Sequence, residues 1–80
     1  MTIIAATISS DTHADTTIYK YGRNFTAGEF VEECRALVED LYDGGEPSDL
    51  DDAEVSFKWD RATLRAELGD FGITFTMRKF

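Results

Sequence analysis

The sequence contains only one cysteine and one histidine among its 80 residues. A lone cysteine, Cys34, excludes an internal disulfide, and no Cys/His cluster offers a zinc site in its place. These absences suit a reducing compartment, so we expect a cytoplasmic protein. No apolar run approaches the roughly 18 residues of a membrane span, and Met1 to Ser10 lacks the basic flank of a signal peptide. We therefore expect neither export nor membrane insertion.

The sequence motifs of the common hydrolases are also missing. The chain contains no G-x-S-x-G motif, no phosphate-binding loop and no H-E-x-x-H motif. Carboxylates are plentiful, but an exposed helix face provides none of the burial that tunes a general acid. We expect no enzymatic activity and no cofactor.

Two stretches contain residue types that bind metals. Asp11, His13 and Asp15 alternate as D-x-H-x-D, which would direct all three side chains to one side of an extended loop. Polar loops often collect these residues without binding a metal. Residues 43–54 begin and end like a calcium-binding loop, but Pro47 stands where an oxygen ligand is needed. We expect no metal site.

The hydrophobic pattern predicts a folded domain with strands on both sides of a helix. An apolar fraction of 42% is too high for an acidic disordered chain. Residues 2–8 are β-branched or small, with Ile4, Ala6 and Ile8 able to share one face, and residues 16–21 are β-branched and aromatic. Three later segments alternate apolar and polar side chains, as in half-buried strands. Short polar or glycine-containing connections favour hairpins. These strands are predicted at residues 2–8, 16–21, 55–59, 63–68 and 71–78.

The helix between the second and third strands has the clearest boundaries. Thr26 and Glu29 are spaced as a capping box, while Phe25 and Phe30 are spaced as a hydrophobic staple. Apolar residues then recur at helical spacing, and Gly44 or Gly45 supplies a stop. The prediction is a helix from Ala27 to Asp43 in a single α+β domain over residues 1–80, of order ββαβββ, with one amphipathic helix packed on an antiparallel sheet. The apolar stripe consists of Phe30, Val31, Cys34, Leu37, Val38 and Leu41.

Two further residues have structural interpretations. Cys34 lies in the apolar stripe, where a thiol behaves as a small hydrophobic group. Trp59 follows Val55 and Phe57 in alternation, so we expect all three side chains on the buried face, although a tryptophan can also anchor an interface.

Charge is distributed unevenly. Eleven of the sixteen acidic residues lie between Glu29 and Glu54, where Arg35 is the only basic residue. Such a concentration of one sign repels itself but speeds the encounter with a basic partner. The alternative is a solvated face that keeps the protein soluble, but interspersed signs are normal for solubility alone. We therefore predict a partner-binding surface that consists of Glu29, Glu32, Glu33, Glu39, Asp40, Asp43, Glu46, Asp49, Asp51 and Asp52.

Basic residues are concentrated in the last third of the chain. Arg61, Arg65, Arg78 and Lys79 can form a basic sheet face. Four charges are too few, beside so acidic a surface, to argue for nucleic-acid binding. We expect no direct binding of nucleic acid by this chain.

A small capped domain without a catalytic motif, with a one-sided acidic surface from Glu29 through Asp52, resembles the phage-encoded inhibitors known as anti-CRISPR proteins. Several of these act as mimics of double-stranded DNA and block the lysine-rich surface on which a CRISPR surveillance complex reads its target. The resemblance implies an inhibitor in the cytosol of a host cell. It also implies that the acidic helix face and the acids of residues 49–52 contact the partner.

Two functions are therefore considered. The first is an inhibitor, a monomer or weak dimer, that occupies a basic nucleic-acid-binding site. The second is a small phage structural or assembly protein whose sheet pairs with itself or another chain. Partner binding by the inhibitor should weaken steeply with added salt, whereas a sheet-mediated oligomer depends on apolar contacts and tolerates salt.

Overall fold

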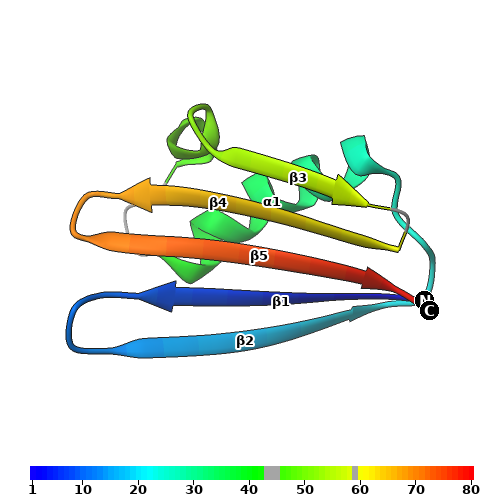
Figure 1. The fold of residues 1–80 in the computed structure, drawn as a ribbon, viewed down its shortest axis with the longest axis horizontal. Coiled ribbons are helices and arrows are strands. Elements are labelled where there is room, and N and C mark those ends of the chain that lie inside the picture. Colours follow the sequence, from blue (N-terminus) through cyan, green and yellow to red (C-terminus); the bar gives the residue numbers. More distant parts are fainter. Residues whose placement is uncertain (43–45, 59) are drawn as a thin grey trace.

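Within residues 1–42, 46–58 and 60–80, which the computed structural model describes, five strands form one antiparallel sheet and one α-helix packs on it (Figure 1). The predicted ββαβββ order and α+β class are confirmed. The elements are β1 (Thr2–Ser9), β2 (Ala14–Tyr21), α1 (Ala27–Leu41), the 3₁₀ helix η1 (Pro47–Leu50), β3 (Glu54–Lys58), β4 (Arg61–Leu68) and β5 (Phe71–Lys79).

The strands lie in the order β2-β1-β5-β4-β3, so the first and last strands of the chain are neighbours. Their pairing brings the chain ends together, and the backbone N–H of Phe80 donates to the carbonyl of Met1 at 2.8 Å. Figure 1 shows the two ends side by side, with α1 behind the sheet. Strands β2 and β3 form the two edges of the sheet.

The start of α1 follows the predicted capping box. The Thr26 side chain accepts from the Glu29 N–H at 3.2 Å, and the Glu29 carboxylate accepts from the Thr26 N–H at 3.0 Å. Phe25 and Phe30 are both buried, as a hydrophobic staple requires. Burial of Phe25 orients the entry to the helix, and its N–H donates to the buried hydroxyl of Thr2 at 3.1 Å.

The helix ends earlier than predicted. The last helical residue is Leu41, and the N–H of Tyr42 donates to the carbonyl of Val38 at 3.1 Å. Asp43, Gly44 and Gly45 lie outside the described residues. The following segment was predicted as a loop, but it contains η1, because Pro47 has its backbone preset for a helical first turn and Leu50 is buried.

The core lies between α1 and one face of the sheet. Alternate residues of the central strands are buried, among them Ile4, Leu64 and Phe75. From the helix, Phe30 and Cys34 are fully buried against them. The alternation read from the sequence therefore gives the correct inward face for β1, β4 and β5. The β4–β5 turn is a two-residue hairpin whose first position, Gly69, has the positive φ of 64° that a type II′ turn needs.

Strand β3 differs from the expectation of burial. Val55 pairs with Leu64 and Phe57 with Ala62, so both side chains lie on the inward face as predicted. They are nevertheless 41% and 47% exposed. The reason is that β3 is an edge strand, with a neighbouring strand on one side only, although Phe57 meets Phe30 of the helix edge to face. Trp59 lies outside the described residues.

Candidate functional site

The acidic side chains of α1 divide by their position around the helix. At about 100° per residue, Glu32 and Glu39 point away from the core, whereas Glu29, Glu33 and Asp40 lie on the flank beside β2. Residues seven apart stand two turns, or about 10.5 Å, apart along the helix axis. The helix therefore carries two short acidic rows, Glu32 with Glu39 and Glu33 with Asp40.

Glu29 serves the fold. Besides closing the capping box, its carboxylate binds the guanidinium of Arg23, whose central carbon also lies 4.5 Å from the centroid of the Phe25 ring. The hydrogen bond from the Thr26 backbone, followed by that from Arg23, lowers the pKa of Glu29 to about 2. A carboxylate already held by two partners offers little to a third.

Glu33 is held by the neighbouring sheet edge. The hydroxyl of Tyr21 donates to its carboxylate at 3.1 Å. Burial, and then this bond to Glu33, raises the pKa of Tyr21. Burial, and secondarily the charge of Asp40, raises the pKa of Tyr19 on the same edge strand. Tyr21 therefore holds Glu33 against β2.

Glu32, Glu39 and Asp40 are exposed, and within residues 1–42, 46–58 and 60–80 none of them forms an ion pair or a side-chain hydrogen bond. Of the predicted acids on the described helix, these three are available to a partner.

The second acidic group surrounds η1. The carboxylate of Asp49 accepts from the backbone N–H of Glu46 at 2.9 Å. Asp51 binds Arg35 at 2.9 Å, and the same guanidinium nitrogen donates to the Pro47 carbonyl at 3.0 Å. Arg35 thus ties α1 to η1 at the boundary between the two acidic groups. Asp52 is exposed, and the predicted Asp43 lies outside the described residues.

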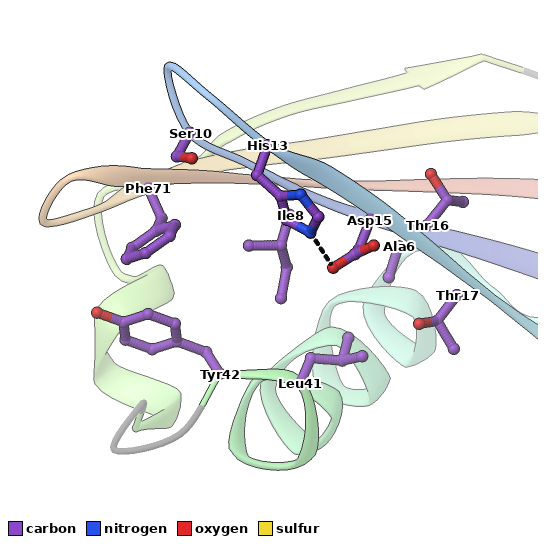
Figure 2. A pocket seen from close by; sticks show the side chains of 10 residues that line it. All are labelled: Ala6, Ile8, Ser10, His13, Asp15, Thr16, Thr17, Leu41, Tyr42 and Phe71. Carbon is purple, nitrogen blue, oxygen red and sulfur yellow. Dashed lines mark hydrogen bonds and ion pairs between the residues drawn. The ribbon is translucent and has the colours of Figure 1, made fainter.

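A feature that sequence reasoning missed is a cavity of about 540 Å³ between α1 and the β1–β2 hairpin. Figure 2 shows Leu41 and Tyr42 on one side and Ile8 and His13 facing them. The rings of Tyr42 and Phe71 meet edge to face at 5.7 Å. The volume falls in the range of small-molecule sites. Its walls come from three distant segments of the chain, so no local pattern indicates it.

His13 and Asp15, two of the three D-x-H-x-D residues, lie at the rim of this cavity. His13 Nε2 and Asp15 Oδ2 are 2.7 Å apart, and the two side chains are 70% and 75% exposed. Solvent screens such an exposed pair, so this contact contributes little to stability. In the described part of the chain, no three His, Cys, Asp or Glu side chains are arranged to hold a metal ion.

Two other predictions concern burial and the membrane. Cys34 is completely buried, and burial raises the pKa of its thiol, as expected of a structural cysteine. Among the described residues, no helix is long and apolar enough to cross a membrane.

Comparison of this chain with known protein families, curated proteins and solved structures finds no match.

Proposed function

We propose that this protein is an acidic inhibitor that occupies a basic nucleic-acid-binding site on a partner protein. The observation that carries the proposal is the set of free acids on α1: Glu32 and Glu39 on the outward face and Asp40 on the adjacent flank are exposed and unpaired among the described residues. The acids around η1 extend the surface beyond Arg35. By the likeness to DNA-mimicking anti-CRISPR proteins, the proposed partner is a CRISPR surveillance complex. The proposal includes no catalysis.

Helix geometry supports imitation of a nucleic-acid backbone. Glu32 and Glu39 are separated by about 10.5 Å along the axis, which equals about three base steps of 3.4 Å in one strand. The second row, Glu33 and Asp40, repeats that spacing on the adjacent flank. Because α1 is fixed to the sheet by its buried stripe, the carboxylates are presented without ordering a flexible segment.

The test compares two charge-reversed variants in affinity capture from a bacterial lysate. Glu32→Lys/Glu39→Lys changes the proposed surface, and Asp11→Lys/Asp70→Lys makes the same charge change at exposed positions elsewhere. A close ion pair across an interface contributes about 1.5 kcal/mol or more, so losing two should weaken binding at least about 100-fold. The control should keep its partner. Equal capture by both variants would contradict the proposal.

Assembly through the sheet is the second candidate function. Both edge strands are uncovered, and β3 exposes Val55 and Phe57 on its inward face. Unpaired edges are templates for further strands. This function predicts a concentration-dependent oligomer that persists in high salt and is lost in Phe57→Ser. Sedimentation velocity at low and high salt distinguishes it from the charge-driven inhibitor.

A further inference from the structure

The sheet face opposite α1 carries a row of cations that the sequence does not reveal. Strand register places Lys20 opposite Ile3, Ile3 opposite Arg78, Arg78 opposite Arg61, and Arg61 opposite Lys58. The row therefore crosses all five strands at one level and contains four basic side chains. All four are exposed. We call Lys20, Arg78, Arg61 and Lys58 the basic row.

Folding does not account for this arrangement. Like charges directly opposite each other destabilise a sheet. Lysines on edge strands protect against edge pairing, which explains Lys20 and Lys58 but not Arg78 and Arg61 on interior strands. The nearest described compensation is Asp60, 4.0 Å from Arg61. Among the described residues, this is the one ion pair formed by the four cations. Cations with so little compensation, at fixed spacing on a rigid surface, are arranged for an anion that comes from outside.

Arg65 shows the contrast on the same face. It lies opposite Glu54, and its guanidinium is 3.5 Å from the Glu67 carboxylate. A cation that the fold needs for itself is accompanied by acids, as Arg65 is. It also provides a control, because removal of its charge changes the net charge by the same amount as removal of one arginine of the basic row.

An exposed aromatic ring adjoins the basic row. Phe80 is 63% exposed, and the Arg78 guanidinium lies 5.2 Å from its ring centroid. Stacked aromatic and guanidinium groups beside a basic surface are the elements with which proteins bind single-stranded nucleic acids, because bases stack on the ring while phosphates meet the cations.

The acidic residues of α1 do not cancel the positive field of the sheet face opposite the helix. The molecule measures 20 Å along its shortest axis, whereas the Debye length is about 10 Å at 0.1 M salt. Charges on α1 are therefore largely screened from a ligand on the opposite side of the sheet.

We propose that the open sheet face binds a single-stranded nucleic acid, with phosphates on the basic row and a base stacked on Phe80. Strands about 4.8 Å apart give the row a length of about 19 Å, which accommodates five or six nucleotides at about 3.4 Å each. The sequence-based expectation of no nucleic-acid binding rested on the number of charges. The strand register shows, in addition, that four basic side chains are aligned in one row across the sheet. This inference is independent of the inhibitor function, which uses the other face.

The test measures the anisotropy of a fluorescent oligothymidylate of about 12 nucleotides, titrated with the whole protein between 50 and 200 mM salt. Four phosphate contacts predict a slope of about −2.8 in log affinity against log salt, or about 50-fold weaker binding over this range. Arg61→Gln/Arg78→Gln should halve the slope, whereas Arg65→Gln should leave it unchanged. Phe80→Ala should weaken binding at least about fivefold.

Several results would overturn the proposal. These are no binding at 50 mM salt, an equal loss in Arg65→Gln, or no effect of Phe80→Ala. Salt-sensitive self-association that Arg61→Gln/Arg78→Gln abolishes, without oligonucleotide binding, would assign the row to the acidic face of a second copy instead. The urea midpoint of the double variant should not fall, because the substitution relieves repulsion; a lowered midpoint would contradict the argument that the row does not serve the fold.

Discussion

The buried contact between Thr2 and Phe25 predicts that a single hydroxyl stabilises the approach to α1. Thr2 is fully buried, and its side-chain oxygen accepts from the Phe25 N–H at 3.1 Å. Thr2→Val keeps the side-chain shape but leaves that N–H without a partner. An orphaned buried donor costs about 1–3 kcal/mol, and the added apolar burial of valine offsets part of it. We expect a loss of about 1–2 kcal/mol.

Thermal and urea unfolding measure this loss. At about 4–8 °C per kcal/mol for a domain of this size, the melting temperature should fall by about 4–16 °C with an unchanged urea m value. Hydrogen exchange of the Phe25 amide should accelerate. Thr76→Val, at an exposed position of β5, is the control and should stay within about 0.5 kcal/mol of the parent. An unchanged melting temperature in Thr2→Val would refute the reasoning.

Four other predictions follow from described contacts. Thr26→Ala removes the helix cap and should cost about 1 kcal/mol, which an unchanged denaturation midpoint would contradict. Because the pKa of Glu29 is lowered, its charge stabilises the fold above the unfolded value and loses this effect as pH falls toward about 2. Glu29→Gln should therefore melt below the parent at pH 7, with a gap that narrows on acidification; a constant gap would count against this. Phe57→Ala should cost about 1 kcal/mol because the ring is half exposed, whereas Phe30→Ala should cost about 3–5 kcal/mol, so equal losses would be inconsistent with an edge position. Calorimetry with calcium, zinc and manganese should show no stoichiometric micromolar binding, and a heat signal would overturn that expectation.

Features that depend on neighbours in the sequence were predictable. The capping box requires only Thr26 and Glu29 three residues apart, and strand alternation requires only the next residue but one. The helix start and the inward faces of β1, β4 and β5 follow from such local rules. Cys34 was placed correctly for the same reason.

Features that depend on strand order were not predictable. The prediction that Val55 and Phe57 are buried was wrong, because nothing local to that segment marks it as an edge strand. The pairing of Arg35 with Asp51 spans 16 positions and changes which carboxylates remain available to a partner. The basic row combines Lys20, Arg78 and the Lys58–Arg61 pair through the register of all five strands, and the cavity beside Tyr42 likewise combines distant segments.

Competition with duplex DNA tests the central claim most directly. Proteins captured from a bacterial lysate by the immobilised chain are washed with a duplex at constant salt, and the retained fraction is measured. If Glu32, Glu39 and Asp40 occupy a nucleic-acid site, the duplex should release the partner. The Glu32→Lys/Glu39→Lys variant should capture no partner from the same lysate. A partner that remains bound while it also binds the duplex would contradict the inhibitor function and favour assembly through the sheet.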